Sequence, residues 1–90
     1  METVFERVKR VIAGVIAIDE KYIVPQAALI DDLGADSLDL VNMTVAVEEE
    51  FSGEGKTLKF SEEEAEQIRT VQDVLDFLAK NGIVDPPPAS

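Results

Sequence analysis

The sequence predicts a small all-α domain made of three main helices and one short helix. Apolar residues recur at helical spacing in several segments, and no segment alternates apolar and polar residues as a half-buried strand would. Three of the expected helix starts carry a Ser or Thr with an acidic residue three positions later. In that pattern each side chain bonds the backbone N–H of the other residue. With 90 residues, the chain is long enough for one such domain.

The first predicted helix covers residues 3–16, where Thr3 and Glu6 form the capping pattern and the apolar residues share one face. Residues 17–36 break the helical pattern, because Pro25 disfavours a helical conformation in the residue before it and turn-forming residues follow. A connection of this length is unusual in a compact domain. Since apolar residues along it can pack onto a core, we expect a long ordered loop.

The next helix is predicted over residues 37–51 and has two apolar stripes. At about 100° per residue, the two stripes fall on nearly opposite sides of the helix. In a domain of this size only one stripe can face the core, and we expect it to be the larger one. The core stripe is Leu40, Met43, Val47 and Phe51, and the exposed stripe is Leu38, Val41 and Val45.

Two further helices are predicted in the second half of the chain. Ser61 starts a short acidic helix whose apolar anchors are Ala65 and Ile68. Thr70 starts the last helix, which presents one apolar face. Gly82 is expected to end that helix, since glycine readily adopts the left-handed conformation found there.

The remaining segments are expected to lack regular structure. Residues 52–56 contain two glycines and predict a flexible loop. Residues 84–90 contain three consecutive prolines and predict an extended, disordered tail. The folded domain is therefore expected to span residues 1–83.

Composition excludes several classes of function. Eight Lys and Arg stand against 19 Asp and Glu, a net charge of −11, so nucleic-acid binding and attachment to anionic membranes are not expected. The absence of Cys and His removes disulfides, thiolate zinc sites and the usual nucleophile–base pairs. No metal-binding loop is found, and no apolar run is long enough to insert across a bilayer. We expect a cytoplasmic protein that is not an enzyme and that binds a basic patch on another protein.

Ser37 is the candidate functional residue. Its simplest interpretation is structural, since either Ser37 or Asp36 could cap the helix that starts here. Three features favour a modified residue instead: the long loop before it, the exposed stripe beside it, and the free amides at a helix start that favour a phosphate group. Without a nearby base, Ser37 is not an activated nucleophile, so a second protein must activate it.

The residues around Ser37 resemble a known family. The segment Asp-Leu-Gly-Ala-Asp-Ser-Leu-Asp, residues 32–39, and the segment Val-Ala-Val-Glu-Glu-Glu-Phe, residues 45–51, closely resemble acyl carrier proteins of bacterial type II fatty acid synthesis. The resemblance extends over about residues 2–81. It implies a four-helix bundle with a short third helix and a free-standing, monomeric carrier.

The resemblance also implies a prosthetic group. A phosphopantetheinyl transferase (holo-acyl carrier protein synthase) would move 4'-phosphopantetheine from coenzyme A onto Ser37. The thiol of this arm would carry acyl groups as thioesters and deliver them to acyl-transferring and chain-elongating enzymes with basic docking patches. This agrees with the absence of Cys, because the chain then imports its thiol.

Further site residues follow from the same resemblance. Acidic residues that would meet basic partner patches are Asp36, Asp39, Glu48 and Glu49, and apolar residues in the same contacts are Leu38, Val41 and Val45. Residues that would contact a folded-back acyl chain are Met43, Val47 and Phe51.

Two departures from the family pattern leave the pathway open. Asn42 stands on the partner face where the family usually has Glu, and the connection over residues 52–60 is about five residues longer and adds Lys56 and Lys59. The departures indicate either neutral drift or a specialised set of partners. Two alternatives to a fatty acid carrier also remain: a carrier of an aminoacyl or polyketide unit, and an acidic helical adaptor in which Ser37 is only a cap.

Overall fold

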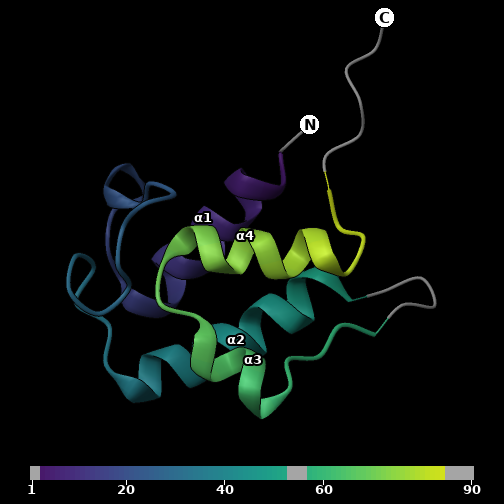
Figure 1. Ribbon diagram of the computed structural model, residues 1–90. Helices are drawn as coiled ribbons and strands as arrows, with labels where there is room; N and C mark the ends of the chain where they lie inside the picture. Colours follow the sequence, from purple (N-terminus) through teal and green to yellow (C-terminus); the bar gives the residue numbers. More distant parts are fainter. Residues whose placement is uncertain (1–2, 53–56, 85–90) are drawn as a thin grey trace, which may run out of the picture.

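A computed structural model describes residues 3–52 and 57–84 of the protein. Within these residues the chain forms α1 (Val4–Ile16), a short 3-10 helix η1 (Glu20–Tyr22), α2 (Ser37–Phe51), α3 (Glu62–Gln67) and α4 (Val71–Lys80) (Figure 1). The predicted all-α fold, with three main helices and a short third one, is confirmed. Of the predicted tail, only Val84 falls within the described part of the chain.

The helices begin and end as their local sequences dictate. At Thr3, Ser61 and Thr70 the hydroxyl accepts the backbone N–H three residues later, at 3.1, 3.1 and 3.2 Å, and that acidic side chain bonds back. At the end of α4, Gly82 is left-handed with φ of 82°, directly after the cap residue Asn81. The N–H of Ile83 then donates to the carbonyl of Leu78 at 2.8 Å, which closes the helix end.

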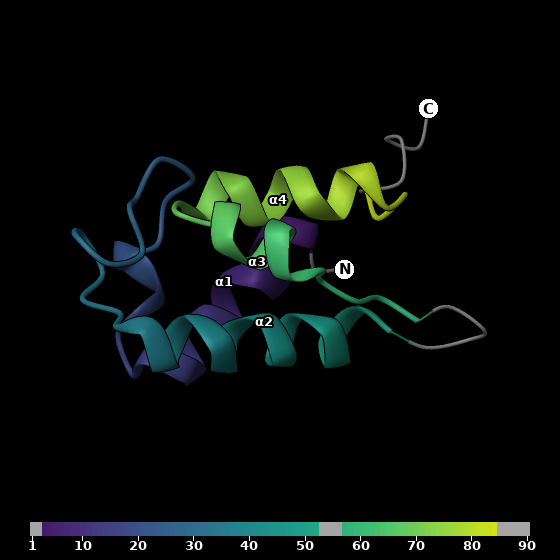
Figure 2. The same cartoon turned by 60° about the horizontal axis from the view of Figure 1, so that its bottom comes forward.

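α1 packs against both α2 and α4 and contributes the centre of the core. In Figure 2, α2 and α4 lie at opposite edges of the bundle, with α3 in front of them and α1 behind. The fully buried side chains at the helix contacts are Val8, Ile12, Met43, Val47, Val71, Val74 and Leu78. This apolar layer fixes where α2, and therefore Ser37, sits in the domain.

The connection between α1 and α2 is the ordered loop that the sequence predicts. Ile23, Ala27, Leu29, Leu33 and Ala35 are buried in the core. Backbone bonds also attach the loop to the segment between α3 and α4: the N–H of Leu29 donates to the carbonyl of Arg69 at 2.8 Å, and the N–H of Val71 donates to that of Ala27 at 3.1 Å. The loop therefore holds the start of α2 against the rest of the bundle.

The two apolar stripes of α2 face as predicted. Met43 and Val47 are buried in the core, and Leu40 and Phe51 are partly buried against it. The opposite stripe is exposed: Leu38, Val41 and Val45 keep 67, 58 and 46% of their surface accessible.

The connection from α2 to α3 is anchored after its glycine-rich part. Residues 53–56, most of the predicted flexible loop, lie outside the described residues. After them, the N–H of Leu58 donates to the hydroxyl of Ser52 at 2.9 Å, and the N–H of Phe60 donates to the carboxylate of Glu48 at 2.6 Å. The ring of Phe60 stacks on that of Phe77, with 3.8 Å between centroids.

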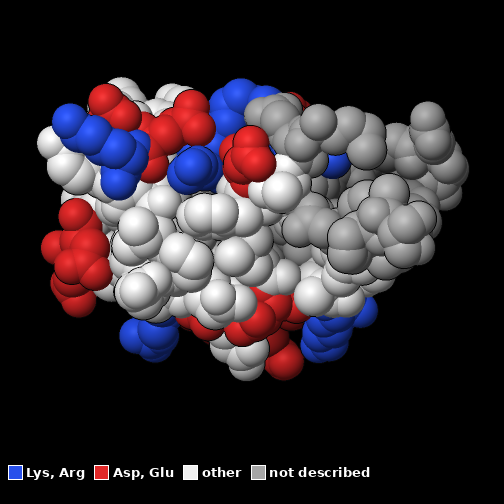
Figure 3. Space-filling view, turned by 90° about the horizontal axis from the view of Figure 1, so that it is seen from above, with Lys and Arg blue, Asp and Glu red and all other residues white. Residues whose placement is uncertain are grey.

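Basic side chains are unevenly distributed over the fold. α1 holds Arg7, Lys9 and Arg10, three of the chain's eight Lys and Arg. Seen from above, Lys and Arg lie among Asp and Glu around an uncharged centre (Figure 3). α2, by contrast, contains acidic side chains and no Lys or Arg.

Candidate functional site

Asp36, not Ser37, caps the start of α2. The Asp36 carboxylate accepts the backbone N–H of Asp39 at 2.8 Å, and the Asp39 carboxylate accepts that of Asp36 at 3.2 Å. Asp36 is extended, with φ of −107° and ψ of −177°, as a cap residue should be. Of the two capping residues that the sequence allowed, the structure selects the aspartate. The interpretation of Ser37 as the cap is wrong.

Ser37 is consequently left with an exposed and uncommitted hydroxyl. It is the first residue of α2 and is exposed. Its Oγ has no hydrogen-bond partner among residues 3–52 and 57–84. Helical geometry also offers no intrahelical acceptor to the N–H groups of Ser37 and Leu38 in the first turn. The positive end of the helix dipole and these amides suit a phosphate ester on the Ser37 hydroxyl.

A tight turn delivers the chain to this position. The N–H of Leu33 donates to the carbonyl of Ala28 at 3.1 Å, and the N–H of Ala35 donates to that of Leu29 at 2.9 Å. Gly34 between them has φ of 76°, a left-handed conformation that glycine adopts without a Cβ penalty. Because Leu33 and Ala35 are also buried, the cap and Ser37 follow directly from a fixed segment.

Within residues 3–52 and 57–84, no hydrogen bond links the Ser37 hydroxyl to a side chain that could act as its base. The neighbouring carboxylates of Asp36 and Asp39 are engaged with backbone amides, and the chain has no His. A group transfer to Ser37 therefore needs a base from another protein.

A cleft of about 240 Å³ opens beside Ser37 between α2 and α3. Its wall on α2 includes Thr44, whose hydroxyl donates to the carbonyl of Val41 at 2.8 Å and is therefore already engaged within the helix. The lining residues are Ser37, Leu40, Val41, Thr44, Ala65, Glu66 and Ile68.

The three residues expected to contact an acyl chain do not line this cleft. Met43 and Val47 lie in the core, at 1 and 0% exposure. Phe51 follows Ser37 by 14 residues along α2, which is about 21 Å at 1.5 Å per residue. Sequence reasoning named Ala65 and Ile68 only as anchors of α3, and it missed Thr44 and Glu66. The walls depend on how α3 crosses α2, which no local pattern reports.

The residues expected on the partner face lie together on the outer side of α2. Leu38, Val41 and Val45 form an exposed apolar strip there, and Asn42 and Glu49 are exposed as well. Narrow apolar strips with charged edges are typical of protein contact sites.

The four expected acidic contacts differ in availability. Asp36 is exposed but caps α2, and Asp39 is half-buried in the same cap. Glu48 is half-buried and accepts the N–H of Phe60. Glu49 is exposed, and its carboxylate has no partner in the part of the chain that the structure describes. Glu49 is therefore the carboxylate most available to a basic partner.

Residues 3–52 and 57–84 contain neither a candidate metal site nor a candidate membrane-spanning helix. No group of three or more acidic side chains there could hold a metal ion. No helix in the same residues is long and apolar enough to cross a membrane.

Comparisons with known proteins identify the family. Residues 6–78 match the model of the phosphopantetheine attachment site family. An acyl carrier protein of Syntrophobacter fumaroxidans is 46% identical over 71 residues, which cover 79% of this chain and 82% of that protein. One from Thermosynechococcus vestitus is 45% identical over 75 residues, covering 83% and 86%. With its helical fold and its exposed serine at the start of α2, the chain belongs to the acyl carrier protein family, whose covalent prosthetic group is 4'-phosphopantetheine.

Proposed function

We propose that 4'-phosphopantetheine is attached to Ser37 and that the loaded protein carries acyl groups in fatty acid or related lipid biosynthesis. The observation that carries this proposal is the division of roles between two adjacent residues. Asp36 caps α2, so the hydroxyl of Ser37 is exposed and free at the helix start.

The attachment is a phosphoryl transfer in which a phosphopantetheinyl transferase is the enzyme and this protein the substrate. The Oγ of Ser37 forms a bond to the phosphorus atom that bears the pantetheine arm of coenzyme A. The pyrophosphate bond breaks and adenosine 3',5'-bisphosphate leaves, while the serine proton passes to a base of the transferase. The first-turn amides of α2 would stabilise the negative charge of the phosphodiester. The bound group supplies the thiol that this sequence lacks.

The outer side of α2 is the proposed docking face for the transferase and for acyl-transferring and chain-elongating enzymes. Leu38, Val41 and Val45 supply apolar area, while Asp36 and Glu49 meet basic groups of the partner. Rim charges of this kind chiefly accelerate encounter, so association is expected to slow as ionic strength rises. We propose that the protein acts as a cytoplasmic monomer in these exchanges.

The cleft between α2 and α3 is the proposed entrance for an acyl chain. Leu40 and Thr44 line it, and Met43 and Val47 each follow one of these residues by three positions, on the same helix face. A chain that parts α2 from α3 would therefore meet Met43 and Val47 next. Phe51 lies at the far end of α2 and would be reached only by a long chain.

Intact-mass analysis tests the attachment. The protein is incubated with coenzyme A and a phosphopantetheinyl transferase, and we expect the mass of one phosphopantetheine to be added. Ser37→Ala should abolish the addition and keep the helical content. Ser61→Ala is the matched control, because Ser61 also stands at a helix start but caps it. Loading of the Ser37→Ala variant, or no loading of the unaltered protein, would contradict the proposed attachment at Ser37.

A further inference from the structure

A second, larger cleft adjoins the one at Ser37. Its volume is about 440 Å³, within the range usual for small-molecule sites. Both clefts share Leu40, Glu66 and Ile68, so a group attached to Ser37 can enter either. The lining residues of the larger cleft are Ala28, Ile30, Asp31, Leu40, Glu66, Ile68 and Arg69.

Arg69 is the one cation among the residues that line these two clefts. It is exposed, and its guanidinium makes no hydrogen bond or ion pair with any residue that the structure describes. Asp31 and Glu66 line the same cleft, yet neither carboxylate pairs with it there. An uncommitted guanidinium in a chain of net charge −11 is available to an added acceptor group.

The backbone beneath this guanidinium is fixed. The N–H of Arg69 donates to the carboxylate of Asp73 at 2.9 Å, and its carbonyl accepts the N–H of Leu29 at 2.8 Å. The next residue, Thr70, pairs with Ala28 in an isolated bridge. In Figure 2 this junction lies beside the loop that leads into α2. Backbone hydrogen bonds therefore join the segment that precedes Ile30 to the segment that carries Arg69, and so connect two walls of the cleft.

We infer that the near half of the pantetheine arm rests in this cleft and that Arg69 is its positioning residue. This inference rests on the proposed attachment at Ser37. Counted from the serine, the arm presents a phosphodiester, a carbon with two methyl groups, a hydroxyl and an amide. The methyl groups suit the apolar side chains of Ile30, Leu40 and Ile68, which line the cleft.

The guanidinium suits the polar atoms of the same half of the arm. Phosphate, hydroxyl and amide oxygens are all acceptors, and Arg offers five N–H donors in a planar fork. Asp31 and Glu66 oppose the phosphate by their charge, and Arg69 offsets them. The contact leaves the thiol end of the arm free for exchange with enzymes.

Nuclear magnetic resonance of the full chain tests this placement. Spectra of unloaded and loaded protein are compared for the unaltered chain, Arg69→Met, Arg69→Lys and Lys59→Met. Lys59→Met is the matched control, because Lys59 is exposed but lines neither of these clefts. Intact mass confirms loading of each sample, and the unloaded spectra confirm that each variant keeps the fold. A loading failure would count against the proposed attachment, whereas the spectra of loaded samples test only this inference.

Loading of the unaltered protein should shift amide signals at residues 28–31 and 69–70 as well as those around Ser37. It should also give cross-relaxation between the arm's methyl protons and the methyl groups of Ile30 or Ile68. Arg69→Met should reduce both effects to less than roughly half, because methionine offers no donor and the charge-assisted bonds to the arm are lost. Arg69→Lys should retain part of them, and Lys59→Met should leave them unchanged. Shifts confined to residues 36–41, or shifts at residues 28–31 that persist in Arg69→Met, would overturn the inference.

Discussion

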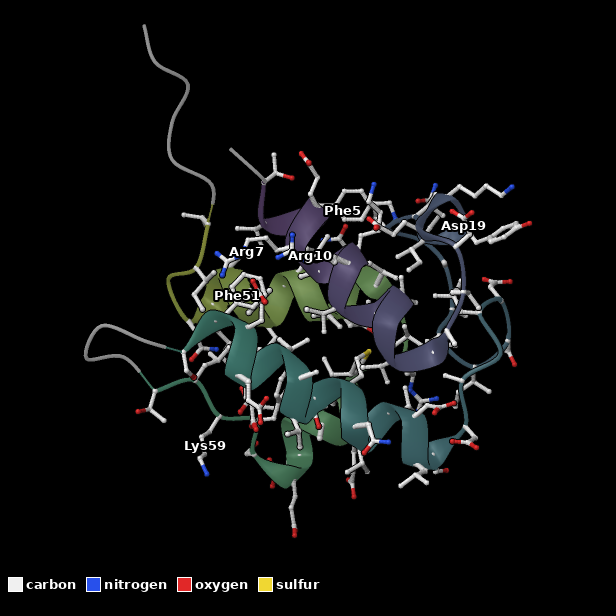
Figure 4. All side chains as sticks on the ribbon, turned by 180° about the vertical axis from the view of Figure 1, so that it is seen from behind. Phe5, Arg7, Arg10, Asp19, Phe51 and Lys59 are labelled. Carbon is white, nitrogen blue, oxygen red and sulfur yellow. The ribbon has the colours of Figure 1, made fainter. Side chains whose placement is uncertain are left out.

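Arg7 of α1 holds the last turn of α2 through Glu50. Its Nε donates to the Glu50 carboxylate at 2.9 Å, and its Nη2 donates to the Glu50 backbone carbonyl at 2.9 Å. That carbonyl is among the four at the helix end that have no partner within the helix. The same guanidinium lies 4.4 Å from the ring centroid of Phe51 (Figure 4). Nη2 of Arg10 approaches the Glu50 carboxylate at 3.3 Å. One arginine thus fixes the end of α2 opposite to Ser37.

Removal of this arginine should destabilise the fold. We expect Arg7→Met to lower the free energy of unfolding by about 1–2 kcal/mol, since two charge-assisted bonds are lost from a half-exposed pair. Arg7→Lys should recover only part of the loss, because an ammonium cannot reproduce the fork. Urea unfolding measures the effect. The exposed control Lys59→Met should stay within about 0.5 kcal/mol of the unaltered protein, and an equal loss in both variants would contradict this assignment.

Two small residues near the end of α1 are expected to admit stabilising substitutions. Gly14 is exposed inside the helix, with open space where the methyl group of an alanine would lie, so Gly14→Ala should stabilise by about 0.5–1 kcal/mol. Ala17 is left-handed, with φ of 63°, so Ala17→Gly should stabilise by about 0.5 kcal/mol. Gly82→Ala is the opposite control, since a left-handed glycine is lost. Denaturation midpoints that fall in both of the first two variants would refute the prediction.

Substitutions at Asp39 and Glu49 should have different effects, the first on the stability of the fold and the second on binding to partner enzymes. Asp39→Lys should lower the free energy of unfolding by about 1 kcal/mol, because the carboxylate that bonds the Asp36 N–H is lost. Glu49→Lys should leave stability within about 0.5 kcal/mol, since Glu49 is exposed. It should nevertheless slow association with the transferase, most clearly at low ionic strength. Stopped-flow association rates and urea unfolding, measured on both variants, check the two expectations. Unchanged association in Glu49→Lys would remove this residue from the docking face.

The start of α3 should contribute a pH-dependent term to stability. The backbone N–H and hydroxyl of Ser61, and then the Lys80 ammonium, hold the pKa of Glu64 below its ordinary 4.5. A lowered pKa in the folded protein adds stability that is fully present above pH 4.5 and is lost as pH falls through the folded value. Glu64→Gln keeps an acceptor but does not titrate there. The unaltered protein should therefore lose its advantage over Glu64→Gln in unfolding experiments below pH 4.5, and parallel pH profiles would contradict the assignment.

The parts of the fold that local spacing determines could be predicted. The bounds of α2 and its two stripes follow from residues 37–51 alone, and the caps at Thr3, Ser61 and Thr70 join residues only three positions apart. At the start of α2, two suitable capping residues, Asp36 and Ser37, stand side by side. The choice of Asp36 over Ser37 could not be made without the backbone conformation.

The parts that depend on distant contacts could not be predicted. Glu48 looks like any acidic surface residue in the sequence, yet it bonds the N–H of Phe60, twelve positions away. Arg69 gains its place only because the loop before α2 pairs with the segment after α3. The cleft beside Ser37 likewise combines α2 and α3, whose crossing is set by the packing of the whole bundle.

The most direct test of the central claim is tandem mass spectrometry of the protein isolated from its native host. The peptide that contains Ser37 should carry phosphopantetheine on that serine, and part of it should bear an acyl group that hydroxylamine removes, as expected for a thioester. The Ser61 peptide should be unmodified and serves as the internal control. A Ser37 peptide that is always unmodified, or an arm on another serine, would contradict the account.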